Sequence, residues 1–110
     1  MMQFIESQHN KLIQYYGNNS TDKERILART VKLVEEVGEL CNEVLAYHKD
    51  QRKEKLAEHD EANLPHEFAD VIITTLLLAR AMDVDVSAGL KSKIEKINKR
   101  FEAEHGSKGD

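Results

Sequence analysis

Residues 68–82, FADVIITTLLLARAM, form the longest apolar segment of this 110-residue chain. Between Asp70 and Arg80 the segment has no charge, and at about 100° per residue its apolar side chains surround a helix on every side. A helix that is apolar all round is normally buried. Glu67 and Asp70 fall about 60° apart on the first turns of this helix. Both carboxylates are therefore predicted to face protein rather than water.

A second group of carboxylates lies upstream in KLVEEVGEL, residues 32–40. On a helix the stripe at i, i+4, i+7 and i+11 is Lys32, Glu36, Glu39 and Glu43, and Glu35 stands beside it. A buried carboxylate needs a basic residue, a shared proton or a metal ion as its partner. If the two helices pack antiparallel, their carboxylates converge, and such a set of oxygen ligands suits Mg²⁺ first and Mn²⁺ next. Ion pairs with Lys32 or Arg80 are the alternative without a metal.

The arc next to the acidic stripe is apolar and is predicted to face a core. Its members are Leu33, Val34, Val37, Leu40, Cys41, Val44 and Leu45. Cys41 is the only cysteine, and we interpret it as a small core residue in a reducing compartment. Gly38 lies in mid-helix, where it costs roughly 1 kcal/mol relative to Ala. This glycine predicts the close approach of another helix or a ligand.

Composition predicts a single all-α domain, because the chain has one proline, five glycines and no long β-branched alternation. A formal net charge of −4 argues against a nucleic-acid-binding surface. The N-terminal residues lack the apolar core of a signal peptide, and no apolar run is long enough to span a bilayer. We therefore expect a soluble, cytoplasmic protein without membrane partners. At this length the core is limited, so self-association is a natural way to bury more surface.

The pattern predicts four helices: residues 3–16, residues 22–48, residues 63 to about 83, and a last helix from Ser87 to about residue 105. Ser20, Thr21 or Asp22 is expected to cap the second helix, Asn63 and Pro65 to start the third, and Ser87 to cap the fourth. The charged residues 50–63 are expected to be a frayed helix end or a mobile loop. We assign residues 1–105 to the domain and residues 106–110 to a disordered tail.

The last predicted helix is basic, with five lysine and arginine residues between 91 and 100. Its apolar face is formed by Leu90, Ile94, Ile97 and Phe101. Lys93, Lys96 and Arg100 share one flank of this face, whereas Asn98 lies elsewhere on the helix. Cations beside a carboxylate–metal cluster are what a polyphosphate needs, since the metal binds some phosphate oxygens and Lys or Arg the others. The alternative is an ordinary solvated helix face with cations near its C-terminus.

The order EExxE (residues 35–39), a gap of 27 residues, ExxD (residues 67–70), an apolar run and a last helix with Lys, Asn and Arg resembles the MazG-like nucleotide pyrophosphohydrolases. These belong to the all-α NTP pyrophosphatase superfamily, and the resemblance covers roughly residues 33–101. It implies a four-helix bundle protomer, assembled as a dimer or dimer of dimers. It also implies Mg²⁺-dependent hydrolysis of a (d)NTP to the monophosphate and pyrophosphate, an activity of the nucleotide-pool house-cleaning kind.

Carried over by position, the resemblance makes Glu36, Glu39, Glu67 and Asp70 the metal ligands. Glu35 would position water or act as the base, a role for which Glu39 is the alternative. The phosphate-side candidates are Lys32, Lys93, Asn98 and Arg100. Phosphoribosyl-ATP pyrophosphohydrolases have similar motifs and remain an alternative. The chain also lacks the Trp that some relatives selecting cytosine nucleotides use, so base preference stays open.

Two interpretations from other classes remain. A di-iron bundle would need Glu and ExxH ligands from facing helices, and ExxH occurs at Glu6/His9 and Glu102/His105, away from both acidic groups. A non-enzymatic helical interaction module would use its carboxylates only to pair Lys and Arg.

Overall fold

The computed structural model describes residues 1–16, 21–48 and 63–105. These residues form four helices and no strand: α1 (Met2–Tyr16), α2 (Asp22–His48), α4 (Asn63–Ala81) and α5 (Val86–His105). The predicted all-α class is therefore confirmed. The predicted mobile or frayed segment, residues 50–63, lies outside the described residues except for Asn63, which begins α4, and the predicted tail at residues 106–110 also lies outside them.

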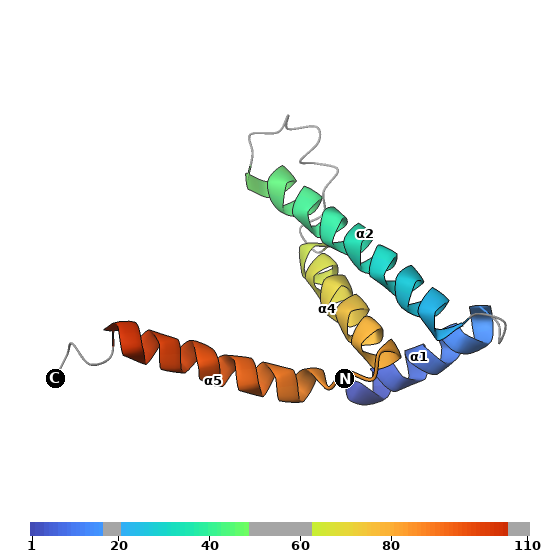
Figure 1. Cartoon of the computed structure of the whole chain (residues 1–110). Helices are drawn as coiled ribbons and strands as arrows, with labels where there is room; N and C mark the ends of the chain where they lie inside the picture. The colour runs from blue at the N-terminus through green and yellow to red at the C-terminus, as the bar shows by residue number, and fades with distance from the viewer. Residues whose placement is uncertain (17–20, 49–62, 106–110) are drawn as a thin grey trace.

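Helices α2 and α4 lie side by side and form the main packing of the chain, and α1 packs against the C-terminal part of α4 (Figure 1). Helix α5 extends away from these three helices, which differs from the four-helix bundle expected of one protomer. The radius of gyration is 18.9 Å, whereas a compact domain of this length has about 13 Å. The bundle is therefore not closed within one chain.

Local capping explains where the helices begin. The Thr21 hydroxyl accepts a hydrogen bond from the Glu24 amide at 3.1 Å, as predicted for the start of α2. Helix α4 begins at Asn63 with Pro65 in its first turn, also as predicted. The prediction of Ser87 as the cap of the last helix is wrong. Asp85 accepts the Ala88 amide hydrogen bond at 3.0 Å, so the cap lies two residues before Ser87 and α5 starts at Val86.

The fully buried hydrophobic side chains in the described residues are Ile5 and Ala46. The expectation that the third predicted helix is buried on all sides is not met, because Thr74 is the one residue of α4 that is buried, at 9% exposure. Phe68 and Ile72 are 50% and 52% exposed. The reason is that α1 and α2 cover two sides of α4, while α5 extends away and leaves another side open.

Part of the apolar arc on α2 also faces outward. Cys41 is exposed, which corrects its interpretation as a core residue, and Val34 is 68% exposed. Cys41 and Val34 lie about 140° and 160° around the helix from Glu36, which faces α4. A Cβ added at Gly38 would meet nothing within 4 Å among the described atoms, so no close approach within one chain explains this glycine.

A buried polar group joins α1, α2 and α4 near the end opposite the carboxylates. The Arg29 guanidinium donates from the same nitrogen to His9 Nδ1 at 2.9 Å and to the Leu77 carbonyl at 2.8 Å. Arg80 adds a two-bond ion pair with Glu6, at 2.6 and 2.9 Å, between α4 and α1. Burial, followed by the positive charge of Arg29, lowers the pKa of His9, so the ring is held neutral as an acceptor.

This arrangement predicts a loss of stability in acid. Because the pKa of His9 is lower in the folded state, the unfolded chain takes up a proton first as the pH falls below the ordinary value of about 6.5. The free energy of unfolding should then decrease with falling pH until the lowered pKa is passed. Urea unfolding at pH 7 and pH 5 measures this slope, and His9→Gln, whose amide oxygen can still accept from Arg29, should flatten it.

Arg29→Met tests the same group without a change of pH. This variant leaves the Leu77 carbonyl and His9 Nδ1 without their donor and should lower the free energy of unfolding by about 1–3 kcal/mol. Lys23→Met, at an exposed position on the same helix, is the matched control and should be nearly neutral. Equal stabilities of all three proteins would show that the buried contacts do not hold α1 in place.

Candidate metal centre

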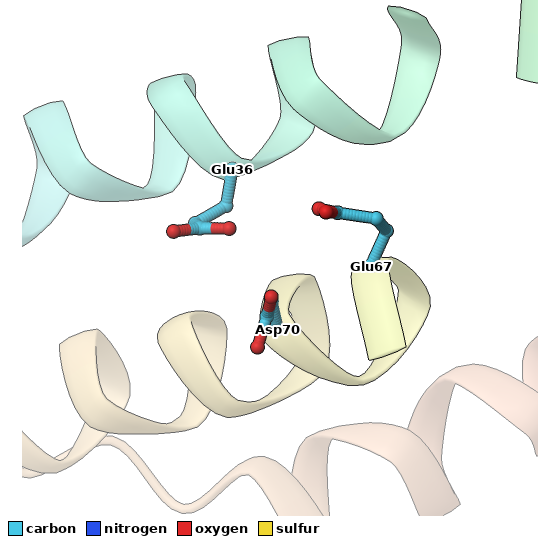
Figure 2. A group of neighbouring side chains, drawn as sticks. All are labelled: Glu36, Glu67 and Asp70. Carbon is cyan, nitrogen blue, oxygen red and sulfur yellow. The ribbon is translucent and has the colours of Figure 1, made fainter. Parts of the chain in front are cut away.

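Three carboxylates from the two acidic groups meet between α2 and α4. Glu36, Glu67 and Asp70 each place one oxygen so that all three lie within 4.8 Å of one another. Figure 2 shows Glu36 pointing from α2 toward Asp70 and Glu67, which come from successive turns of α4. The spacing of three residues puts Glu67 and Asp70 on one side of α4. The packing of α2 against α4 supplies the third group from a segment about 30 residues away in the sequence.

Within the part of the chain that the structure describes, two carboxylate oxygens of this cluster have no hydrogen-bond partner. They are Oε2 of Glu36 and Oε2 of Glu67, and both are shielded from solvent. Glu36 is buried. Glu67 is half-buried, in line with the expectation that it faces protein, whereas Asp70 is exposed, contrary to the same expectation. A shielded carboxylate oxygen without a donor is costly. The arrangement fits a cation held between the two helices, because three carboxylates offer the hard oxygen ligands that Mg²⁺ and Mn²⁺ prefer.

The neighbouring negative charges in the cluster make ionisation of the Glu67 carboxyl group less favourable. Burial, followed by the charges of Glu39, Asp70, Glu36 and Glu43, raises the pKa of the Glu67 carboxyl. Lys32 offsets part of this charge, since its Nζ lies 3.2 Å from Glu36 and 3.7 Å from Glu35. These contacts raise the pKa of the Lys32 ammonium, chiefly through the hydrogen bond with Glu36.

One of the two basic residues considered as partners in the absence of a metal does pair with the cluster. Lys32 contacts Glu36, but Arg80 pairs with Glu6 and Asp83 instead. Of the predicted ligands, Glu39 is exposed and contributes no oxygen to the group of three, although its charge acts on Glu67. Glu35 is likewise exposed and lies against Lys32.

The predicted phosphate-binding residues divide into two places. Lys32 lies at the cluster. Lys93, Asn98 and Arg100 lie on α5, are exposed, and are not brought to the carboxylates of their own chain, because α5 extends away from α2 and α4. The ExxH pairs considered for iron do not join a metal group in the described residues, and His9 instead accepts from Arg29.

The buried pairing of Arg29 with His9 was not among the features predicted from the sequence. The spacing of Arg29 could have indicated that it faces α4. Arg29 precedes Glu36 by seven residues and so lies on the same face of α2, about 20° away. No comparable pattern singled out His9, since its burial depends on how α1 crosses α4.

Replacing Glu67 by Gln should stabilise the metal-free protein. The raised pKa of Glu67 means that ionisation is less favourable in the folded than in the unfolded chain. Above this raised pKa the fold therefore carries a penalty, which disappears as the pH falls through it. We expect a higher melting temperature for Glu67→Gln in EDTA at neutral pH, and a smaller difference in acid.

The same melting experiment tests the metal. Mg²⁺ should raise the melting temperature of the wild type, because a ligand of the folded state stabilises it by mass action, and the rise should be largely lost in Glu67→Gln. Glu24→Gln, at an exposed position in the first turn of α2, is the matched control. Identical curves for wild type and variant, with and without Mg²⁺, would contradict the assignment of Glu67 to a metal centre.

The fold and the cluster define a class: an all-α protein with a carboxylate centre, suited to a metal ion, between two neighbouring helices. The chain belongs to the MazG-like family, whose family model matches residues 28–109. The match includes both acidic motifs and the whole of α4 and α5. It confirms the family resemblance that the two motifs indicated, and it suggests a nucleotide pyrophosphatase-type fold.

The comparisons with curated proteins and with solved structures found no match. Among the described residues, none of the helices has the length and apolar character needed to cross a membrane.

Proposed function

We propose that this protein is a Mg²⁺-dependent nucleoside triphosphate pyrophosphohydrolase that converts a (d)NTP to the monophosphate and pyrophosphate. The observation that carries the proposal is the pair of shielded, unpartnered oxygens on Glu36 and Glu67, within a group of three carboxylates. Such oxygens are stabilised by a cation, and a cation-filled acidic centre attracts a polyphosphate that the bare cluster would repel. Membership of the MazG-like family supports a nucleotide as the substrate.

Each residue of the site has a proposed task. Glu36, Glu67 and Asp70 would hold Mg²⁺, for which Mn²⁺ can substitute. When bound, the metal supplies charge neutralisation at the phosphates and lowers the pKa of water. Exposed Glu39 or Glu35 would accept the proton from the attacking water. Lys32, already against Glu36, would keep that carboxylate oriented and add positive charge near the phosphates.

The direct test is incubation of the protein with a panel of canonical and modified NTPs and Mg²⁺, followed by chromatographic separation of the products. The expected products are the monophosphate and pyrophosphate in equal amounts, with no turnover in EDTA. Including phosphoribosyl-ATP in the panel distinguishes the related pyrophosphohydrolase activity. The absence of Mg²⁺-dependent pyrophosphate from every substrate would contradict the enzymatic function.

A non-enzymatic interaction module makes the opposite prediction for the metal. If Lys32 alone compensates the carboxylates, neither EDTA nor Mg²⁺ changes the melting temperature. A Mg²⁺-dependent rise in melting temperature that is lost in Glu36→Gln favours the metal centre.

A further inference from the structure

We propose that the cavity between α1, the beginning of α2 and the end of α4 binds a small oxyanion of the size of phosphate. The cavity is separate from the metal centre. Arg25, which lines it, lies eleven residues before Glu36, which is about 17 Å along the axis of α2. Arg80 lies ten residues after Asp70, which is about 15 Å along the axis of α4. The proposal therefore goes beyond the hydrolase function and does not depend on it.

The cavity has a volume of about 130 Å³ and is lined mainly by polar side chains. A drug-sized ligand needs a pocket of about 300 Å³ or more, so this cavity suits a ligand of a few heavy atoms. The polar lining consists of His9 from α1, Asp22 and Arg25 from α2, Arg80 from α4, and Asp83 from the link that follows α4.

His9 contributes a donor that its own chain does not use. The residue is 8% exposed, and its Nδ1 accepts a hydrogen bond from Arg29 at 2.9 Å. A neutral imidazole that accepts at one nitrogen carries its proton on the other, so Nε2 is a donor. Within the described ranges of the chain, Nε2 has no hydrogen-bond partner. A buried N–H group without an acceptor is costly, and an oxyanion in the cavity would remove this cost.

The positive charge next to His9 has no counter-ion among the described residues. Arg29 is buried, and its hydrogen bonds go to two neutral acceptors, His9 Nδ1 and the Leu77 carbonyl. Burial, followed by the positive charges of Arg25 and Arg80, lowers the pKa of the Arg29 guanidinium. A buried cation that lacks a counter-ion destabilises the fold. A bound anion beside His9 would supply the compensating negative charge.

The carboxylates of the cavity lie at its solvent-exposed edge. Asp22 pairs with Arg25, and Asp83 pairs with Arg80 at 3.0 Å. The side chains of Asp22 and Asp83 are 85% and 88% exposed, whereas those of Arg25 and Arg80 are mostly covered. Water screens exposed carboxylates more strongly than covered guanidinium groups. Positive charge therefore dominates at the inner wall of the cavity.

The arginines favour an oxyanion over a spherical anion such as chloride. Guanidinium groups present their N–H donors in a planar fork that matches two oxygens of one phosphate or carboxylate. Glu6 and Asp83 accept three of the five N–H donors of Arg80, so two remain for a ligand. An oxyanion that contacts Arg80, Arg25 and His9 would join α4, α2 and α1.

Calorimetric titration with inorganic phosphate, in metal-free HEPES buffer at constant ionic strength, tests the site. The wild type should bind phosphate saturably, with one anion per chain. Arg25→Gln should weaken binding by about tenfold or more, because a charge-assisted contact is lost. Lys23→Gln removes the same charge two positions away, from a residue that does not line the cavity, and should bind like the wild type.

Asp83→Asn is a second variant whose effect has the opposite sign. It removes a carboxylate from the edge of the cavity, and asparagine tolerates the positive φ of 55° at this position. Phosphate should therefore bind several-fold more tightly, even if Arg25→Gln proves unstable. Glu67→Gln, at the metal centre, should leave the phosphate affinity unchanged. Loss of hydrolase activity would not alter these expectations, since the titration contains neither metal nor triphosphate.

A parallel titration with a nucleoside monophosphate identifies the source of the oxyanion. The small volume predicts weaker binding of the monophosphate than of free phosphate. Equal or tighter binding that is still lost in Arg25→Gln would support the site and assign it to the phosphate group of a nucleotide. Absence of saturable binding of both compounds by the wild type would overturn the proposal. Equal phosphate affinities of the wild type, Arg25→Gln and Asp83→Asn would also overturn it.

Discussion

The Asp70→Asn variant is expected to lose turnover of the preferred NTP by about two to three orders of magnitude, the scale seen when one fixed charged or polar group is removed from an active site. Asp70 places an oxygen within 4.8 Å of those of Glu36 and Glu67, and an amide in its place contributes no negative charge to the metal. Its exposed position means that the substitution creates no cavity. Circular dichroism should therefore show an unchanged helical content.

Steady-state kinetics over a range of Mg²⁺ concentrations measure this effect. Glu24→Gln is the matched control, because it makes the same type of change on α2 near the opposite end from the cluster. Glu39→Gln should give an intermediate loss, since Glu39 contributes charge but no oxygen to the group of three. Wild-type rates and Mg²⁺ dependence in Asp70→Asn would reject Asp70 as a ligand.

The second large effect concerns α5. Arg100→Ala should lower kcat/KM by one to two orders of magnitude, because a charge-assisted contact with phosphate is worth about 1.5–3 kcal/mol. Lys99→Ala removes the same charge from the adjacent position but lies about 100° away around the helix, on the side opposite the apolar stripe. We therefore expect Lys99→Ala to be nearly silent.

The comparison separates geometry from general charge, since both residues are exposed and one position apart. Equal losses in the two variants would indicate only long-range electrostatics. If neither variant loses activity, α5 does not bind the phosphates, and Lys32 beside Glu36 becomes the remaining candidate among the predicted residues.

Local chemistry made the helices predictable. Thr21 and Pro65 act within one turn of the residues they cap or start, so the beginnings of α2 and α4 follow from a few neighbouring residues. The start of α5 was misplaced because two capping residues compete within three positions. Asp85 has the geometry to accept the Ala88 amide, and this geometry depends on the turn formed by Asp83 and Val84.

The sequence determined that Glu67 and Asp70 share one side of a helix and that Glu36 belongs to a second acidic helix, because a fixed helical period converts spacing into direction. It also indicated the family that the match over residues 28–109 confirms. Which oxygens meet was decided by tertiary structure: the register of α2 against α4 brings Glu36 to the centre and leaves Glu39 outside the group of three.

Burial was the other property that only the tertiary structure decided. An apolar pattern indicates that a helix face is stabilised by burial, but it does not indicate which segment covers that face. Phe68, Ile72 and the stripe of α5 therefore satisfied every local criterion for a core and yet remain half exposed in one chain. The link from Met82 to Asp85 directs α5 away from α2, so the apolar stripe of α5 is not covered by α2 or α4 of the same chain.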